Sequence, residues 1–218
     1  MTGHSRSLSK STVEVKTILG KSFSSNVFVV KADNNFVVDA GAGNIKRIVD
    51  YIDSEEIEID RIILTHRHFD HVGGAKELSE SLDAPLYARG KEAEALRNGD
   101  DRTIISKSFG KEIPEMDVKD LDEETYSGFV VIGTPGHTED SICLYHGEEK
   151  ILFSGDTVFS GGGAGRTDLP TGNFEEIKRS IEILTEYDVH SLYPGHGTCI
   201  EGEGNEHIKL SLKNLSYL

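Results

Sequence analysis

A dense run of potential metal ligands follows a short apolar strand, and it constrains the fold more than any other feature. Residues 62–64 read Ile-Ile-Leu, and the next nine residues read Thr-His-Arg-His-Phe-Asp-His-Val-Gly. In an extended backbone, side chains two positions apart lie on one face, so His66 and His68 can point at one ion. Asp70 and His71 come after the chain begins to turn and can reach a second point nearby. Imidazole and carboxylate groups suit Zn²⁺, Fe²⁺ or Mn²⁺, and the lack of a thiolate here argues against a closed structural zinc site.

Three further ligand-type residues each follow a later apolar stretch. His137 lies in Thr-Pro-Gly-His, Asp156 in Ser-Gly-Asp and His196 in Pro-Gly-His. Loops at strand ends on a rigid scaffold are common positions for functional groups, and the small residues allow close approach of the backbone. Each residue alone is typical of a surface histidine or a turn aspartate. Together with the first run they make five histidines and two aspartates, which is enough for two ligand sets.

The apolar pattern predicts two groups of strands, each followed by helices. Runs rich in β-branched residues predict strands, and helical spacing of apolar residues predicts helices. The expected strands are 13–19, 27–30, 36–39, 62–64, 85–88, 129–134, 142–145, 151–154 and 190–193, and the expected helices are 44–52, 73–82, 91–97, 174–184 and 206–218. This order favours an α/β fold in which two mixed sheets pack face to face with helices outside, a four-layer αββα sandwich. We expect one domain over residues 1–218, with residues 1–12 as a flexible tail.

Residues 98–125 are charged and irregular, and they carry the weakest pattern in the chain. Such a segment suits a lid or an excursion that faces a substrate. It equally suits a solvated connection, and the sequence leaves the two alternatives open.

The charge of the chain excludes some classes of partner. The formal net charge is −15, whereas nucleic-acid binding requires a basic face and docking on anionic lipid requires basic clusters. No window approaches the roughly 20 apolar residues of a membrane span, and the N-terminus lacks the apolar core of a signal peptide. Two cysteines, Cys143 and Cys199, are more typical of reduced thiols than of a disulfide framework. We therefore expect a cytoplasmic protein that acts on a small molecule and binds neither nucleic acid nor membrane.

The order His-x-His-x-Asp-His, then His, Asp and His, resembles the dinuclear motif of the metallo-β-lactamase-fold hydrolases. The resemblance spans nearly the whole chain and implies the same αββα fold. It implies that one metal is held by His66, His68 and His137, and the other by Asp70, His71 and His196, with Asp156 bridging both. The two carboxylates, Asp70 and Asp156, thereby belong to the catalytic centre. It implies two divalent ions as cofactors, with zinc expected and iron or manganese as the alternatives.

Within this family, residues 154–170 are similar to the Gly-Asp-Thr-Leu-Phe…Gly-Arg-x-Asp segment of glyoxalase II and its relatives. Arg166 and Asp168 in that segment are candidate substrate-loop residues, or an ion pair that never meets substrate. Common β-lactamases instead carry cysteine where Asp156 stands, and RNA-processing members need a basic surface. Only 22 residues follow His196, so the helical region that binds glutathione in typical glyoxalase II is not expected.

The implied activity is a glyoxalase II-like hydrolase in which a metal-bound hydroxide attacks a thioester or ester carbonyl. The substrate class includes S-lactoylglutathione and related acyl thioesters. The second hypothesis is a mononuclear-iron persulfide dioxygenase, which resembles glyoxalase II around the same segment, and a third is a non-catalytic metal-binding domain. Asp39, at the end of an expected strand, and Thr65 are candidates to orient the metal-binding imidazoles from behind.

Overall fold

Two mixed six-stranded sheets form the centre of the molecule in the computed structural model, which describes residues 12–43 and 45–217. The first sheet has the order β1 to β6, with strands β1 (Glu14–Ile18), β2 (Val27–Lys31), β3 (Phe36–Val38), β4 (Arg61–Ile63), β5 (Leu86–Ala88) and β6 (Val118–Asp120). The second has the order β14-β13-β10-β9-β8-β7, with strands β7 (Thr125–Tyr126), β8 (Phe129–Gly133), β9 (Ile142–His146), β10 (Ile151–Gly155), β13 (Ser191–Pro194) and β14 (Ile200–Glu201). A separate hairpin pairs β11 (Val158–Phe159) with β12 (Gly163–Ala164).

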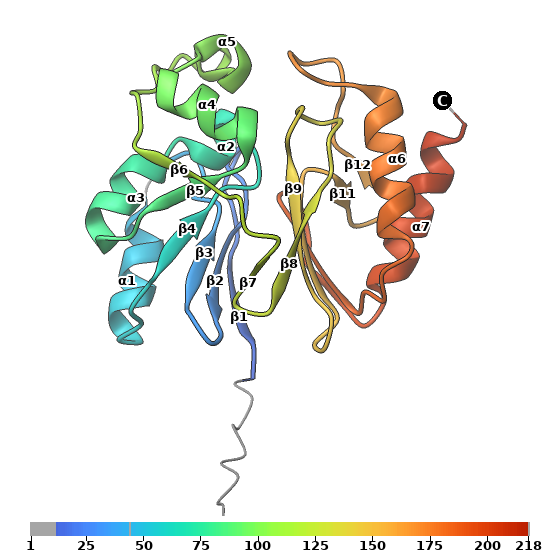
Figure 1. Ribbon diagram of the computed structural model, residues 1–218, viewed down its shortest axis with the longest axis horizontal. Coiled ribbons are helices and arrows are strands. Elements are labelled where there is room, and N and C mark those ends of the chain that lie inside the picture. The colour runs from blue at the N-terminus through green and yellow to red at the C-terminus, as the bar shows by residue number, and fades with distance from the viewer. Residues whose placement is uncertain (1–11, 44, 218) are drawn as a thin grey trace, which may run out of the picture.

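Helices cover the outer face of each sheet (Figure 1). The first half contributes α1 (Lys46–Ser54), α2 (Phe69–Val72), α3 (Ala75–Leu82), α4 (Gly90–Asn98), α5 (Asp101–Ile104) and the 3₁₀ helix η1 (Ser106–Phe109). The second half contributes α6 (Phe174–Leu184) and α7 (Gly204–Leu215). The layers run helix, sheet, sheet, helix, so the expected αββα sandwich is confirmed.

Three apolar cores hold these layers together. The core between the sheets contains aromatic side chains from both, and Phe28 of β2 packs on Phe153 of β10 with ring centroids 5.1 Å apart. A second core lies between the first sheet and its helices, and a third lies between the second sheet and helices α6 and α7. Strands such as β2 are buried on both faces, which explains their continuous β-branched and aromatic composition.

Helix α6 shows how local sequence sets one outer layer. The Asn173 side chain accepts hydrogen bonds from the backbone N–H groups of Glu175 and Glu176, which caps the helix. Ile177 and Ile181 lie one turn apart and are fully buried on the second sheet. The helix begins and ends at the residues that the sequence pattern predicts.

The other element boundaries differ from the predictions by a few residues. The weakly patterned segment 98–125 contains α5, η1 and β6, and β7 begins at its last residue. Position 44, the expected start of the first helix, lies outside the described residues, as do positions 1–11 of the expected tail and position 218. Cys143 and Cys199 are unbridged, as expected, although Cys199 is only half-buried. Among the described residues, no helix is both long and apolar enough to cross a membrane.

Strand direction places the three later ligand loops at one end of the sandwich. Strands β8 and β10 both run antiparallel to β9, and β13 runs parallel to β10. Their carboxyl ends therefore lie at the same edge of the second sheet. His137, Asp156 and His196 follow these three ends.

Candidate metal centre

The first ligand run follows β4 and turns into the short helix α2. His68 precedes the helix with extended backbone angles (φ −60°, ψ 143°), and Asp70 and His71 lie in its single turn. His68 therefore has extended backbone, whereas Asp70 and His71 lie in a helical turn. This change of backbone separates the four side chains into two directions, as the spacing predicts.

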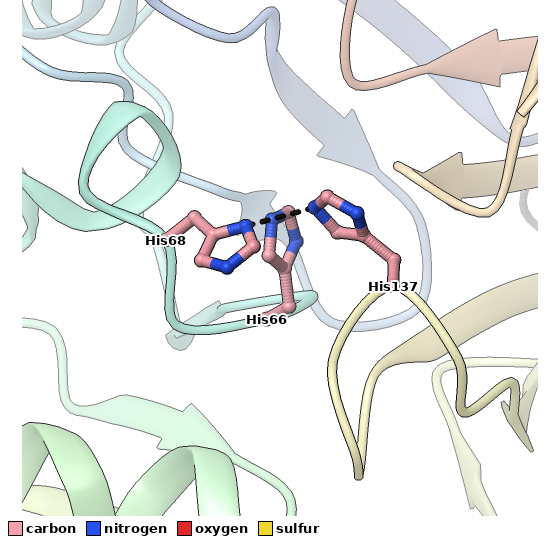
Figure 2. A group of neighbouring side chains, drawn as sticks. All are labelled: His66, His68 and His137. Carbon is pink, nitrogen blue, oxygen red and sulfur yellow. Dashed lines mark hydrogen bonds between the residues drawn. The ribbon is translucent and has the colours of Figure 1, made fainter. Parts of the chain in front are cut away.

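His66, His68 and His137 form a buried group that we call the three-histidine cluster. One nitrogen of each ring lies within 4.8 Å of the others. Figure 2 shows the rings of His66 and His68, from one loop, converging with the ring of His137 from the facing loop. His68 Nδ1 and His137 Nε2 are 2.8 Å apart. The Nε2 atoms of His66 and His68 are buried without a hydrogen-bond partner.

Neighbouring groups set which nitrogens of this cluster carry lone pairs. His137 Nδ1 lies 2.8 Å from the carbonyl oxygen of Arg166, and a carbonyl only accepts, so Nδ1 donates and Nε2 faces the cluster with a lone pair. Burial lowers the pKa of His66 well below its ordinary value and lowers the pKa of His68 to about 3. The imidazoles of His66 and His68 are therefore neutral at neutral pH, which is the form that binds a metal ion.

Asp70, His71, Asp156 and His196 form the second group, which we call the mixed cluster. Its ligand atoms also lie within 4.8 Å of one another. His196 Nε2 is 2.9 Å from Asp70 Oδ2, and His71 Nε2 is 3.1 Å from Asp156 Oδ1. Burial by itself would raise the pKa of Asp156, but the nearby His71 outweighs it and holds that pKa below its usual range. Burial would likewise lower the pKa of His71, but the carboxylates of Asp156 and Asp39 raise it well above the ordinary value.

Asp156 lies between the two clusters and approaches both. Its Oδ2 atom is 3.6 Å from His137 Nε2 and 3.7 Å from His196 Nε2, in addition to the contact of Oδ1 with His71. Gly195 permits this approach, because a Cβ atom there would lie 2.3 Å from Asp156 Oδ1 and 2.5 Å from the His71 ring. The small residue before His196 is therefore required by the mixed cluster.

Asp39 and Thr65 stand behind the ligands and are almost fully buried. Asp39 Oδ2 lies 2.7 Å from His71 Nδ1, so Nδ1–H donates to the carboxylate and Nε2 faces the cluster. Asp39 also accepts from the backbone N–H and the hydroxyl of Thr65, at 2.8 and 2.9 Å. The Thr65 hydroxyl is in turn 3.1 Å from His66 Nδ1. Asp39 has φ of +60°, a conformation that aspartate tolerates better than most residues.

Arg166 and Asp168 lie apart from the clusters. Their side chains are 62% and 69% exposed, and two hydrogen bonds of 2.8 and 2.6 Å join them. The part of Arg166 that reaches the three-histidine cluster is its backbone carbonyl. Asp168 contacts none of the seven ligand side chains through a hydrogen bond or ion pair among the described residues.

A buried ion pair behind the three-histidine cluster escaped the sequence analysis. Arg67 donates through Nε and NH2 to Glu92 of α4, at 2.8 and 3.0 Å, and its backbone N–H donates to Glu92 at 2.9 Å. Glu92 also accepts from the backbone N–H of Asp140, three residues after His137. One carboxylate therefore ties the loop of His66 and His68 to the loop of His137. The only local signal was an arginine between two ligand histidines.

A pocket of about 400 Å³ opens above both clusters. Its lining includes His68, His137, Asp70, Asp156 and His196, and its walls include apolar side chains. Residues Ile105 and Phe109 of the segment 98–125 belong to these walls. That part of the segment therefore faces the candidate metal centre.

Known proteins are similar to this chain in sequence. A model described as the metallo-beta-lactamase superfamily matches residues 20–196. A probable metallo-hydrolase of Methanocaldococcus jannaschii is 36% identical over 188 residues, which is 82% of this chain and 90% of that protein. The hydroxyacylglutathione hydrolase GloC of Haemophilus influenzae is 28% identical over 76% of this chain and 81% of its own length. A hydroxyacylglutathione hydrolase of Bdellovibrio bacteriovorus is 32% identical over 76% of this chain but only 60% of its own length.

Solved structures are similar to this chain in fold. The crystal structure of the B3 metallo-beta-lactamase BLEG-1 superposes with a TM-score of 0.79 at 26% identity, covering 94% of this chain and 99% of that one. The crystal structure of TTHA1623 in a di-iron-bound form superposes with a TM-score of 0.77, also at 26% identity, covering 92% of this chain and 97% of that one.

Proposed function

Because this chain belongs to the metallo-beta-lactamase superfamily, we propose that it hydrolyses a thioester or ester with two divalent metal ions. The observation that carries the proposal is the pair of adjoining ligand clusters, with Asp156 in contact with both, beneath one pocket. The relatives named hydroxyacylglutathione hydrolases, which by that name cleave a thioester, support the choice of bond.

The ligand atoms fit divalent ions on two grounds. Two buried imidazole nitrogens lack a hydrogen-bond partner, and two other ring nitrogens face each other at 2.8 Å. In the proposed assignment His66, His68 and His137 hold one ion, Asp70, His71 and His196 hold the other, and Asp156 serves both. Such ligands accept zinc, iron or manganese, and zinc is our expectation. Two ions when bound supply a hydroxide nucleophile near neutral pH and a Lewis acid for the carbonyl oxygen.

The protein's own residues orient the ligands and shape the site. Asp39 and the Arg166 carbonyl each accept from the Nδ1–H of one imidazole, so His71 and His137 present Nε2 to the centre. The apolar pocket walls limit water around the scissile bond, which strengthens electrostatic interactions there. A thiolate is a good leaving group, so a thioester substrate does not require a strong general acid.

The test is metal analysis combined with hydrolysis of a panel of thioesters, esters and a β-lactam by the full chain. We expect hydrolysis of a thioester or ester by the metal-loaded protein, loss after chelation and recovery on adding zinc. His68→Ala should abolish most activity, and His190→Ala, an exposed histidine outside both clusters, should not. Activity that survives complete metal removal would overturn the proposal.

The same metal-loaded protein also tests the second hypothesis, that the chain is a mononuclear-iron persulfide dioxygenase. That enzyme would consume oxygen with glutathione persulfide and contain one iron per chain. We expect no oxygen uptake and up to two metal ions per chain. Oxygen uptake with one iron would replace the hydrolase by the dioxygenase.

A further inference from the structure

The pocket above the ligand clusters has apolar walls from segments far apart in sequence. Ile105 and Phe109 come from the end of α5 and from η1, Phe159 from β11, Ala164 from β12 and Leu169 from the loop that follows. The metal-ligand side chains make the polar part of the lining. A group bonded to a reacting carbonyl at the clusters would thus meet apolar atoms.

The Phe109 side of this wall is fixed relative to the metal ligands. Its ring centroid lies 4.6 Å from that of Phe23 and 5.4 Å from that of Phe69, which directly follows His68. Aromatic rings at these separations attract one another beyond the area they bury. The position of Phe109 is therefore tied to the position of the loop that carries the metal ligands.

Ile105, which lines the pocket, has a strained backbone conformation. Its φ of +58° is a region that β-branched residues rarely enter. Asp101 holds the turn, because it accepts a hydrogen bond from the Ser106 hydroxyl at 2.6 Å and pairs with Lys107 at 2.6 Å. Strain of this kind persists where the surrounding structure enforces it, often at binding sites.

Positive charge is scarce around the pocket. Of the described residues in its lining, Arg166 alone is a lysine or arginine, and its guanidinium is joined to Asp168 by two hydrogen bonds. Asp70 and Asp156 contribute negative charge. Apart from the proposed metal ions, an anionic group of the substrate would meet only the Arg166 guanidinium, which Asp168 already neutralises.

A second groove of about 570 Å³ meets the site at His196. Its lining includes the hydroxyl side chains of Thr17, Ser22 and Thr198 beside the apolar side chain of Leu19, and the described residues that line it include no lysine or arginine. It suits a polar moiety without net charge.

We propose that the substrate joins an apolar acyl group, seated against Ile105 and Phe109, to an uncharged amide-bearing thiol that lies in the groove beyond His196. This rests on the proposed thioester hydrolysis and narrows its substrate class. It implies that the carboxylates of glutathione contribute nothing to recognition.

The experiment compares acetyl, butyryl and hexanoyl thioesters of N-acetylcysteamine, with the metal-loaded full chain and kcat/KM as the readout. Full burial of a methylene is worth about 0.8 kcal/mol, or roughly fourfold, so partial burial of four methylenes should raise kcat/KM by at least about 10-fold. Hexanoylglutathione should react no faster than the N-acetylcysteamine thioester. A flat chain-length series, or a glutathione thioester preferred by 10-fold or more, would overturn the inference and leave the hydrolase proposal intact.

Two variants test whether Ile105 and Phe109 cause the dependence of kcat/KM on acyl chain length. Phe109→Ala should flatten the chain-length series, and Ile105→Gly should do so without threatening the fold, since glycine adopts a positive φ freely. Ile183→Ala, which truncates a 46% exposed side chain on α6, should preserve the series. An unchanged series in both wall variants would overturn the assignment of the acyl group to this wall.

A binding measurement separates this inference from the proposed function. S-hexyl-N-acetylcysteamine is a thioether that cannot be hydrolysed, and it should shift the NMR signals of the Ile105 and Phe109 amides more than its S-methyl counterpart. This result would support the apolar site even if no thioester were cleaved. Equal shifts from both thioethers would contradict it.

Discussion

The three-histidine cluster and the mixed cluster lie side by side but differ in charge. The first contains imidazoles alone, and burial keeps His66 and His68 neutral by lowering their pKa. The second contains two carboxylates whose pKa is held low by neighbouring histidines despite their burial. A dication in the mixed cluster would be compensated by its own ligands. The three-histidine cluster has no carboxylate of its own, and Asp156 approaches it at 3.6 Å from His137.

The two clusters also differ in what holds them in place. Asp39 contacts an imidazole of the mixed cluster directly. Two rings of the three-histidine cluster contact the Arg166 carbonyl and the Thr65 hydroxyl, and its carboxylate support, Glu92, contacts the backbone of its two loops rather than a ligand ring. Substitutions at these positions should therefore affect the two clusters unequally.

The largest effect is expected from Asp156→Asn, because this side chain approaches both clusters. Loss of its charge removes the carboxylate that lies close to histidines of both clusters. We expect kcat/KM to fall by about 10³-fold or more, which corresponds to several kcal/mol of transition-state stabilisation. Metal content per chain should fall in parallel. The matched control is Asp188→Asn, an exposed carboxylate paired with Lys150, and a variant at position 156 with full metal content and activity would contradict the bridging role.

Glu92→Gln should weaken the support of the three-histidine cluster alone. Removing one partner of a buried ion pair leaves the other charge uncompensated, but Arg67 retains Glu139 at 2.9 Å and Thr103 at 3.2 Å. We therefore expect the lower end of the usual cost, about 3 kcal/mol of unfolding free energy. For a chain of this length that lowers Tm by roughly 6–12 °C.

Thermal unfolding of the metal-free protein measures this loss without interference from bound ions. Glu94→Gln, two residues along the same helix, is the control, because Glu94 pairs with Lys91 at the surface and should contribute little. Equal Tm values for the two variants would show that the buried pair does not support the fold.

The ligands of both clusters could be predicted from the sequence, whereas part of what surrounds and supports them could not. The strand, the His66–His71 run and the Pro-Gly-His loops carry local signals, and the structure brings all seven side chains into the two clusters. Arg67 and Glu92 are 25 positions apart and show no shared pattern, so their pairing appears only when the loop after β4 meets α4 in the folded chain. The positive φ of Ile105 also has no signal in the sequence, because a β-branched residue rarely adopts this conformation and segment 98–125 carries the weakest pattern in the chain.

Asp39→Asn should weaken the support of the mixed cluster, as Glu92→Gln should weaken that of the three-histidine cluster. Asparagine tolerates the positive φ at this position and keeps one acceptor oxygen, but it lacks the charge that orients His71. Loss of such a partner costs about 10–100-fold in metal affinity. We expect one of the two zinc binding constants, measured by competition with a chromophoric chelator, to weaken by this factor. Equal weakening of both constants would show that Asp39 supports the two clusters alike.

The smallest effect is expected from Thr65→Val, which removes a hydroxyl that contacts both Asp39 and His66. This hydroxyl donates to Asp39 and lies 3.1 Å from His66 Nδ1. Asp39 keeps the Thr65 backbone N–H, so the net loss is that of an ordinary hydrogen bond, about 1 kcal/mol or roughly fivefold in affinity. Because the hydroxyl serves both sides, both zinc binding constants should weaken by similar factors, and Thr65→Ser should restore them. Weakening of a single constant would assign the hydroxyl to that cluster and leave the two clusters independently supported.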